Sequence, residues 1–329
     1  MNAGNKGLAN LGNTCYMNTA LQCLSHLLEF HPKNENFKQY LKSSSDIYKE
    51  WYNLQTTLWS NESNSLVVPN KFLQSFIKNC KQNNISFYNF NQNDTEEFIN
   101  IFMDLLHRSI KTEVDISVKG TPVNQVQKLQ VKSIESWSNF FKNDYSYIIK
   151  KFYSQLISIT ACTKCDYLTI NFDPFMVLSL EINDNFKTIY DCFDSYTKKT
   201  KLDTGNTWKC DKCNQFVCPE KKIKLWKTSD VLIILLKRYS NRQKKDNFIE
   251  FPINLDLNEY LVDYNQNGKK YRLSGICIQS GSLGGGHYYA MCYNELDNSW
   301  KQYNDTSVRE IDEEELLKQK PYCLFYRRV

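Results

Sequence analysis

One of the twelve cysteines lies directly between a turn motif and a helix-like segment. Cys15 follows Gly12 and Asn13, residues typical of tight turns. The apolar residues after it have helical spacing: Leu21, Leu24, Leu27 and Leu28. A thiol at a helix N-terminus lies in the positive field of the helix dipole, so we expect a lowered pKa and a reactive thiolate. Backbone N–H groups there can also bind an anionic oxygen. Most free cysteines are simply small buried residues, so this context favours a nucleophile without establishing one.

A thiol nucleophile needs a base, and the chain has four histidines. His287 follows a glycine-rich segment and opens a strand-like one, so it can face a cleft from the rim of a sheet. A surface histidine after a flexible hairpin is an equally good interpretation. One predicted hairpin further on, either Asn304 or Asp305 could accept a proton from the imidazole and hold it in one tautomer. An ordinary Asn-Asp turn would have the same sequence.

Two Cys-x-x-Cys pairs indicate a metal site. Cys162 with Cys165, and Cys210 with Cys213, can supply four thiolates to one tetrahedral Zn²⁺ in a closed structural site. A redox role is less favoured because no βαβ pattern surrounds either pair. Cys218 lies nearby, without an assigned role. A zinc ribbon could bind nucleic acid, but the surrounding charge does not favour that function.

The secondary structure predicted around these residues changes from helices to strands along the chain. Helical spacing follows Asn13 and Thr14, either of which can cap that helix, and a second helical pattern runs from Asp94 to about Ser109. The segments predicted as strands are short and rich in β-branched or aromatic residues: 177–180, 231–236, 271–278, 288–293 and 323–326. Helices followed by strands predict an α+β fold, because a βαβ chain would alternate them.

The composition excludes several classes of protein. In 329 residues, 41% hydrophobic and 14% aromatic content argues against disorder, and interspersed charges with a net value of +5 favour neither nucleic acid nor an anionic membrane. No apolar stretch is long enough to span a bilayer, and the first residues lack the apolar core of a secretory signal. We therefore expect reduced cysteines in an intracellular protein, cytoplasmic or nuclear, with no further domain ahead of the first motif.

Long motifs extend these local patterns over nearly the whole chain, from Gly7 to Tyr326. They are GLANLGNTCYMN at 7–18, QNDTEEF at 92–98, LKRY at 236–239, FPINL at 251–255, GHYY at 286–289 and WKQYNDTSV at 300–308. Together they resemble the ubiquitin-specific protease family, including its cysteine box and histidine box. The family usually has a histidine where this chain has Gln279, but that histidine is not the catalytic base.

The resemblance implies roles for individual residues. The catalytic group would be Cys15 as nucleophile, His287 as base, Asn304 as its orienting partner, Asp305 as a neighbouring acid, and Asn10 as a donor to the oxyanion. The predicted substrate contacts are Gln92, Asp94, Glu97, Gly285, Gly286 and Tyr288. In particular, the acidic residues would meet basic residues of the substrate's tail.

The same resemblance implies a papain-like hand in one catalytic domain, residues 1–329. A helical thumb would span about 1–145, fingers with a zinc ribbon about 150–235, and an antiparallel-sheet palm mainly 236–329 plus adjoining strands. The cofactor would be one structural Zn²⁺, with none in catalysis. The partner would be ubiquitin or ubiquitinated proteins, bound by a monomer, with no nucleic acid and no membrane.

The implied activity is hydrolysis of the peptide or isopeptide bond after the C-terminal glycine of ubiquitin. Two alternatives remain open: a catalytically weak scaffold that binds ubiquitin, and a protease acting on a ubiquitin-like modifier. A measurement of turnover distinguishes the catalytically weak scaffold from the two kinds of protease. Competition between modifier probes for Cys15 distinguishes a protease acting on a ubiquitin-like modifier from one acting on ubiquitin.

Overall fold

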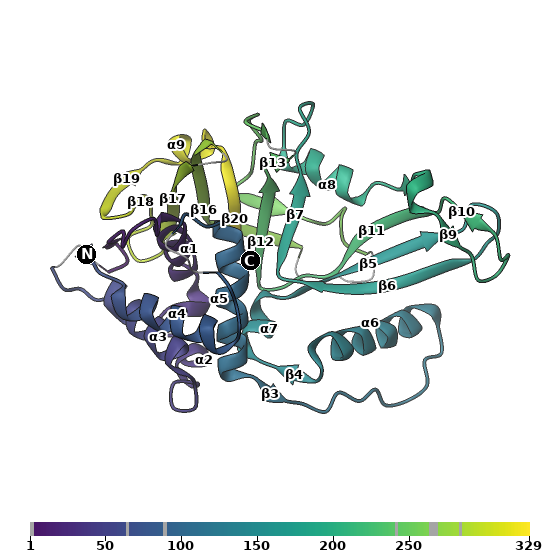
Figure 1. The fold of residues 1–329 in the computed structure, drawn as a ribbon, viewed down its shortest axis with the longest axis horizontal. Coiled ribbons are helices and arrows are strands. Elements are labelled where there is room, and N and C mark those ends of the chain that lie inside the picture. The colour runs from purple at the N-terminus through teal and green to yellow at the C-terminus, as the bar shows by residue number, and fades with distance from the viewer. Residues whose placement is uncertain (1–2, 64–65, 88–90, 241–242, 263–268, 283–284) are drawn as a thin grey trace.

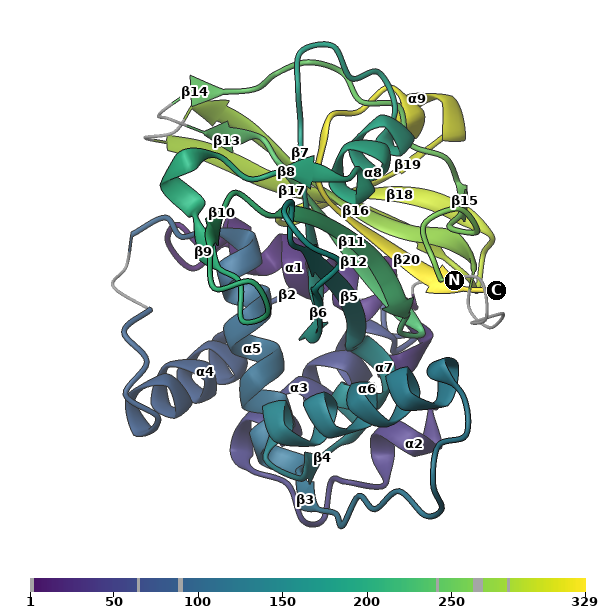
Figure 2. The same ribbon diagram turned by 90° about the vertical axis from the view of Figure 1, so that its right-hand side faces the viewer.

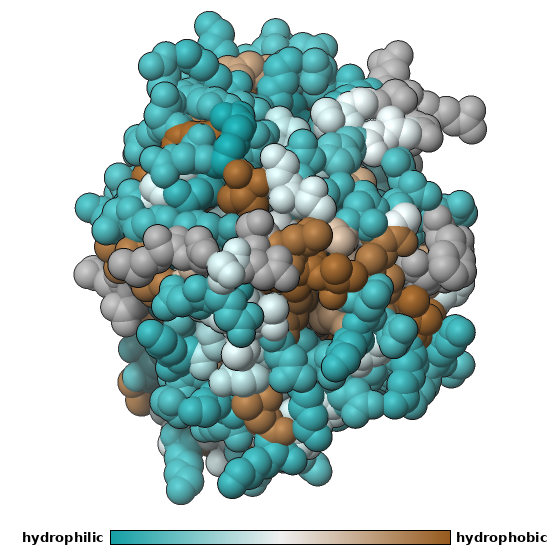
Figure 3. Space-filling view, turned by 90° about the vertical axis from the view of Figure 1, so that its left-hand side faces the viewer, coloured by the Kyte–Doolittle hydropathy of each residue, from teal (hydrophilic) through white to brown (hydrophobic). Residues whose placement is uncertain are grey.

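The structure, a computed structural model, describes residues 3–63, 66–87, 91–240, 243–262, 269–282 and 285–329. A helical part, a large sheet and an elongated arm make up the molecule (Figure 1). Turned by 90°, the large sheet lies above the helical part (Figure 2). The face in Figure 3 is mostly hydrophilic, with apolar side chains gathered near its middle. Among the described residues, none of the helices combines the length and apolar character needed to cross a bilayer.

The helical part is held by an aromatic-rich core. Its helices are α1 (Cys15–Ser25), η1 (Leu28–Phe30), α2 (Glu35–Lys38), α3 (Asp46–Leu58), α4 (Asn70–Gln82), α5 (Thr95–Ile110) and α7 (Tyr147–Phe152). Helix α1 is buried along its whole length, so it lies between the other helices and the sheet. Asp94 caps α5 by accepting hydrogen bonds from the N–H groups of Glu96 and Glu97, which confirms the predicted start of that helix.

The beginning and end of α1 differ from the prediction. Thr14 occupies the N-cap position, but its hydroxyl accepts from the N–H of Leu11 and caps no helical N–H group. The predicted side-chain cap by Thr14 is therefore wrong, because the preceding turn uses the hydroxyl. The helix ends at Ser25, before Leu27 and Leu28, since the chain turns there into η1.

The large sheet carries the C-terminal half of the chain. Among the described residues its strand order is β19-β18-β17-β16-β20-β12-β7, with β15 also paired to β16. All pairs are antiparallel except β12 with β7, which is parallel. The bounds are β7 (Val177–Glu181), β12 (Val231–Lys237), β15 (Asn254–Asp256), β16 (Lys270–Ser282), β17 (Gly285–Asn294), β18 (Ser299–Asn304), β19 (Ser307–Ile311) and β20 (Pro321–Arg328).

Strand β12 shows how two cores meet at this sheet. Ile233 and Leu235 pack into the core shared with the helical part, whereas Ile234 and Leu236 pack into a second core on the other face. Alternate side chains of a strand point to opposite faces, so a continuous apolar run fits a strand covered on both sides. Helix α8 (Ile189–Thr197) covers the second face, and α9 (Glu313–Leu317) precedes β20.

The arm is a separate, smaller sheet with strand order β6-β5-β11-β8. Its strands are β5 (Ser154–Ala161), β6 (Leu168–Phe175), β8 (Thr200–Lys201) and β11 (Glu220–Lys227). Helix α6 (Gln125–Phe141) runs along β6 (Figure 1). At the tip, β9 (Trp208–Lys209) pairs with β10 (Phe216–Val217). The order of helices, main sheet and arm confirms the predicted α+β hand.

Short pairs connect these parts: β1 (Gly7–Leu8) with β2 (Leu66–Val67), β3 (Thr112–Glu113) with β4 (Asp144–Tyr145), and β13 (Tyr239–Ser240) with β14 (Gln243–Lys244). The glycine-rich segment before His287 continues two paired strands, because β16 extends to Ser282 and β17 begins at Gly285. His287 therefore lies within a hairpin.

Candidate active site

The candidate nucleophile is the first residue of α1. Gly12 (φ 95°) and Asn13 (φ 55°) adopt left-handed backbone conformations and turn the chain into the helix. The Cys15 side chain is only 3% exposed. It lies against β17, where backbone hydrogen bonding from Tyr288 reaches the sulfur. The fold therefore brings Cys15 next to the residue that follows His287.

Burial reverses the expected electrostatics of the thiol. The pKa of Cys15 is raised above its ordinary value, first because burial penalises the thiolate and further because of the negative charge of Asp305. Backbone hydrogen bonds from Tyr288 and Tyr16 lower the pKa but do not outweigh the burial. The prediction of a lowered pKa from the helix terminus alone is therefore wrong for the free protein, because it left out desolvation.

His287 and Asn304 are joined across neighbouring strands. β17 pairs with β18, and His287 Nε2 lies 2.5 Å from Asn304 Oδ1. An amide oxygen can only accept, so Nε2 carries the proton and Nδ1 is left to exchange one. Within the described part of the chain, no hydrogen bond joins His287 to Cys15. Such contacts in free enzymes often tighten only when substrate binds.

Asp305 holds a different part of the site. Its residue has φ 47°, and its carboxylate accepts from Asn10 Nδ2 at 2.9 Å and from Asn18 Nδ2 at 2.8 Å. Its backbone oxygen also accepts from the N–H of Leu8 at 2.8 Å. The carboxylate thus fixes side chains from the nucleophile's segment and contacts no imidazole. Asn18, on the first turn of α1, was missed in the sequence because only the tertiary contact distinguishes it.

Asn10 is held from both ends of its amide group. Its Oδ1 accepts from the N–H groups of Gly12 and Thr14, both at 3.1 Å, while one Nδ2 hydrogen goes to Asp305. A side-chain amide has two N–H donors, so the second remains available beside the nucleophile. This geometry fits the oxyanion donor expected from the sequence.

A cavity of about 300 Å³ brings most of the predicted substrate contacts together. Gln92, Asp94, Gly285, Gly286 and Tyr288 line it, together with Gln279, Tyr239 and Tyr322. Glu97 is exposed and is not among the lining residues. The predicted contacts therefore form one channel wall beside His287, except for Glu97.

Two contacts shape this cavity. The side chain of Gln92 makes two hydrogen bonds to the backbone of Gly286. Gln92 Nε2 donates to the carbonyl oxygen of Gly286 at 2.9 Å, and the N–H of Gly286 donates to Gln92 Oε1 at 3.1 Å. A Cβ on Gly286 would lie 2.1 Å from Gln279 Nε2 and 2.7 Å from the carbonyl oxygen of Ser280, so a side chain there would collide with β16. Only glycine fits at this point of the cavity wall.

The carboxylate of Asp94 is already engaged in the cavity. Besides capping α5, Asp94 Oδ2 accepts from the hydroxyl of Tyr322 at 2.6 Å and lies 3.5 Å from that of Tyr288. Burial, and then the charge of Asp94, raises the pKa of both tyrosines, so both remain donors. Tyr322, together with Tyr239, which donates to Gln279 Oε1, was missed because neither position has a distinctive local pattern.

The four cysteines of the two Cys-x-x-Cys pairs meet at the tip of the arm. The sulfur atoms of Cys162, Cys165, Cys210 and Cys213 all lie within 4.8 Å of one another. Cys162 Sγ is 3.9 Å from Cys213 Sγ, and Cys165 Sγ is 3.6 Å from Cys210 Sγ. Cys218 is outside this group. Four converging sulfur atoms form a site that could bind one metal ion.

Comparisons with known proteins agree with this geometry. A family model described as "Ubiquitin carboxyl-terminal hydrolase" matches residues 6–326. Ubiquitin carboxyl-terminal hydrolase 2 from Homo sapiens is 31% identical, over 98% of this chain and 55% of that protein. Ubiquitin carboxyl-terminal hydrolase 5 from Saccharomyces cerevisiae is 30% identical, over 98% and 44%. The chain thus spans about half the length of these curated relatives.

Solved structures show the same fold. The SAGA Ubp8/Sgf11/Sus1/Sgf73 DUB module bound to ubiquitin aldehyde contains a chain with a TM-score of 0.76 and 27% identity, covering 100% of this chain and 70% of that one. The corresponding module bound to monoubiquitin gives a TM-score of 0.76 and 26% identity, with the same coverage.

Proposed function

The chain belongs to the ubiquitin carboxyl-terminal hydrolase family, and from this premise we propose that it is a deubiquitinating thiol protease. It would hydrolyse the peptide or isopeptide bond after the C-terminal glycine of ubiquitin. The observation that carries the proposal is the His287–Asn304 hydrogen bond next to a cysteine at a helix N-terminus. An orienting partner, a base and a nucleophile are the parts that thiol proteases need.

In the proposed mechanism, His287 takes the proton of Cys15 as the sulfur attacks the substrate carbonyl. The second N–H of Asn10 and backbone N–H groups at the start of α1 stabilise the resulting oxyanion. The imidazolium, oriented by Asn304, then protonates the leaving amine, and a thioester remains on Cys15. A water molecule, deprotonated by His287, hydrolyses the thioester and releases the carboxylate product.

The raised pKa of Cys15 assigns a specific task to the base. Because burial and Asp305 disfavour a lone thiolate, the thiolate forms only as the imidazolium forms beside it. Asn304 is neutral and stabilises that imidazolium less than a carboxylate would. Activation therefore depends on bringing the His287 ring against the sulfur when substrate fills the cavity.

The cavity supports ubiquitin as the partner. A passage lined by Gly285 and Gly286, with no room for a side chain at Gly286, suits an extended glycine-rich tail. In the solved relatives the corresponding chains are bound to ubiquitin or ubiquitin aldehyde. We therefore infer that ubiquitin or ubiquitinated proteins bind along Gln92, Asp94 and Tyr288, with Glu97 as an outlying contact.

We also infer that the metal is Zn²⁺ with a purely structural role. Zn–S bonds of about 2.3 Å place tetrahedral ligand sulfurs about 3.8 Å apart. The observed distances of 3.6 and 3.9 Å match this spacing. When bound, zinc supplies a cross-link that holds the two turns at the tip together. Four thiolate ligands leave no open position for substrate.

The wider assignments rest on the same observations. A core containing residues from Leu8 to Phe325 supports a single domain over 1–329, with thumb, fingers and palm near 1–145, 150–235 and 236–329. Strands 177–181 and 231–237 would then be the adjoining strands of the palm. A nucleophilic thiol and a thiolate metal site both require reduced cysteines, which supports an intracellular location, cytoplasmic or nuclear. The proposed oligomeric state is a monomer. We propose neither nucleic acid nor a membrane as partner.

A ubiquitin suicide probe tests the function directly. The probe should label Cys15, as mapped by mass spectrometry, and a ubiquitin C-terminal fluorogenic amide should be cleaved. Cys15→Ala should abolish both signals, while Cys218→Ser, outside the metal cluster, should retain them. Tight ubiquitin binding without turnover would indicate the scaffold instead. Preferential labelling by a ubiquitin-like probe would indicate the other modifier.

A further inference from the structure

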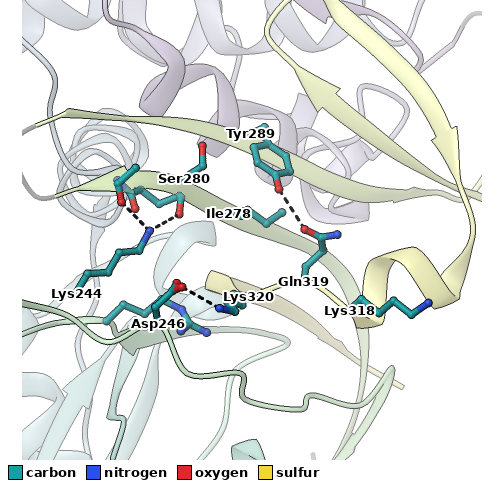
Figure 4. A pocket seen from close by; sticks show the side chains of 11 residues that line it. Lys244, Asp246, Ile278, Ser280, Tyr289, Lys318, Gln319 and Lys320 are labelled. Atoms are coloured by element: carbon teal, nitrogen blue, oxygen red, sulfur yellow. Dashed lines mark hydrogen bonds and ion pairs between the residues drawn. The ribbon is translucent and has the colours of Figure 1, made fainter. Parts of the chain in front are cut away.

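A second cavity, of about 600 Å³, lies on the other side of Gln279 from the proposed tail channel. Strand β16 forms one wall, and the segments around Lys244 and Lys320 form the others (Figure 4). Gln279 lines both cavities, but no other residue is shared between them. The second cavity is therefore a separate site, and it plays no part in the mechanism above.

Its lining has an excess of positive charge. Arg238, Lys244 and Lys320 face one carboxylate, Asp246, which forms an ion pair with Lys320 at 2.9 Å. Lys318 also lines the cavity, but it points away from the other cations (Figure 4) and is neutralised by Glu314. The lining therefore carries an excess of two positive charges.

Arg238 is a buried cation without a direct carboxylate partner. Its side chain is 1% exposed, and it donates to the carbonyl oxygens of Pro321 at 2.7 Å, Asn247 at 3.0 Å and Lys245 at 3.2 Å. Its Nη2 has no hydrogen-bond partner among the described residues. Buried charges are normally paired, so a nearby anion would stabilise this guanidinium.

The ammonium group of Lys244 is fixed by two hydrogen bonds. Its ammonium group donates to the carbonyl oxygens of Gln279 and Gly281, both at 3.0 Å (Figure 4). An ammonium group has three N–H donors, so one remains for a ligand. Burial lowers the pKa of Lys244, and the charges of Arg238 and Lys320 lower it further, although Asp246 opposes them. Arg238 and Lys320 thus lie close enough to repel the ammonium group of Lys244.

We propose that this cavity binds a small polyanion that carries more than one phosphate group. Phosphate oxygens accept several charge-assisted hydrogen bonds at once, and the ligand's charge would balance the excess on Arg238, Lys244 and Lys320. The volume lies within the range of small-molecule sites and exceeds what a single phosphate would fill.

A ligand bound in this cavity would also affect the β16–β17 hairpin, which carries His287. Lys244 holds two carbonyl groups of β16, and Ser280 between them pairs with His287 on β17. A polyanion that immobilises Lys244 would therefore also restrain this part of the hairpin. Amide hydrogen exchange of residues 279–281 should slow when the ligand binds, which locates the site independently of affinity.

Inorganic tripolyphosphate is the probe, used with the Cys15→Ala protein so that the result does not depend on turnover. It should raise Tm in a saturable way, beyond the effect of sodium chloride at equal ionic strength. Lys320→Gln should weaken the fitted Kd about tenfold through loss of one charge-assisted contact. Asp246→Asn removes the opposing charge and should strengthen binding severalfold.

Lys78→Gln is the matched control, because it breaks an exposed Lys–Asp pair with Asp46 far from the cavity, at the same cost in net charge. Its Kd should equal that of the parent, and the Tm of each variant without ligand reports its folding. A Lys320→Gln protein that binds as tightly as the parent would overturn the proposal. So would weaker binding by Asp246→Asn, or a Tm shift no larger than that of sodium chloride.

Discussion

At the scale of single residues, the adjacent pair Asn304 and Asp305 divides two tasks between neighbouring side chains. Asn304 reaches the imidazole of His287, whereas Asp305 reaches Asn10 and Asn18. The left-handed backbone at Asp305 turns its carboxylate towards the nucleophile's segment. One short turn thereby supports both the proposed base and the proposed oxyanion donor. This explains why two polar residues follow one another at this point of the chain.

Substitutions of Asn304 and Asp305 should affect turnover in different ways. Asn304→Ala removes the group that holds the His287 tautomer, so kcat should fall about a hundredfold. Asn304→Asp should restore turnover and move the acid limb of the pH profile to higher pH, because a carboxylate stabilises the imidazolium and only the neutral imidazole can take the proton of Cys15. Steady-state kinetics between pH 6 and 9, in buffers at about the same ionic strength, measure both effects.

Asp305→Asn is the comparison for that series. It keeps the shape of the turn but weakens the hold on Asn10, so kcat should fall while Asn304 still orients His287. It also removes a charge that raises the pKa of Cys15, so alkylation of the free thiol should begin at lower pH. The assignment fails if Asp305→Asn, and not Asn304→Ala, alters the acid limb of the pH profile.

His26 is a buried histidine behind the site, and it should make stability depend on pH. Burial lowers its pKa to about 4, against 6.5 for a solvent-exposed histidine. The unfolded chain therefore binds a proton that the folded protein does not in the window between these values. Stability from this group is present above pH 6.5 and is lost as pH falls towards 4, by about 3 kcal/mol.

Urea unfolding at pH 7.0 and 4.5 measures this loss. His26→Gln, which cannot titrate, should be less stable at pH 7 but should lose less stability on acidification. Its neutral amide can still reach the carbonyl of Gln22 or the hydroxyl of Tyr303, which contact the imidazole. Equal acid sensitivity in the variant and the parent would show that other groups control the effect.

At the scale of elements, strand β1 is locked against the turn that carries Asn304 and Asp305. Leu8 donates to Asp305 O, and a Cβ on Gly7 would lie 2.5 Å from Thr306 O and 2.7 Å from Asp305 O. These atoms belong to backbone, so a methyl group at Gly7 would push the two segments apart. The close approach explains glycine at the first position of the cysteine motif.

Gly7→Ala should therefore damage both stability and catalysis. We expect a loss of about 2 kcal/mol in unfolding free energy, typical of overpacking, and a lower kcat because Asp305 moves away from Asn10. Gly120→Ala offers a control for glycine replacement, since a Cβ there meets nothing within 4 Å. Its φ of 93° still adds some strain, so a smaller loss of stability with unchanged kcat is the expected result.

At the scale of the whole molecule, the candidate catalytic centre and the candidate metal site lie in different parts of the hand. Cys15 and His287 lie where α1 meets β17, whereas the four-cysteine site lies at the tip of the arm. The small sheet of the arm has only a limited apolar core, including Ile157, Phe172 and Trp226. A cross-link at its tip should therefore matter more for the shape of the arm than for the catalytic centre.

Removal of the metal should raise KM for ubiquitin substrates more than it lowers kcat. Cys213→Ser should lose most of the bound zinc, measured by elemental analysis, and lower Tm, because structural zinc stabilises the folded tip. Cys218→Ser, which lies outside the cluster, should keep one zinc per chain and the parent Tm. Retention of full zinc and unchanged KM in Cys213→Ser would remove this residue from the site.

The sequence by itself determined the parts of the protein that local chemistry encodes. The turn before Cys15, the acidic start of α5 and the paired cysteines are set by residues close together in the chain, as is the order of helices before strands. Family motifs then connected Cys15 with His287 across the chain. Most boundaries of these elements fall within one residue of the prediction, because turns and apolar periodicity are local properties, but β16, β17 and β20 are longer than predicted.

Only the tertiary structure decided what depends on residues distant in the chain. It selected Asn304 over Asp305 as the contact of His287, and it showed Asn18 and Tyr322 at the site. It also reversed the expected pKa shift of Cys15, because burial and the charge of Asp305 penalise the thiolate more than the backbone hydrogen bonds favour it. Burial and charge at a site are sums over the whole fold, so a local motif cannot specify them.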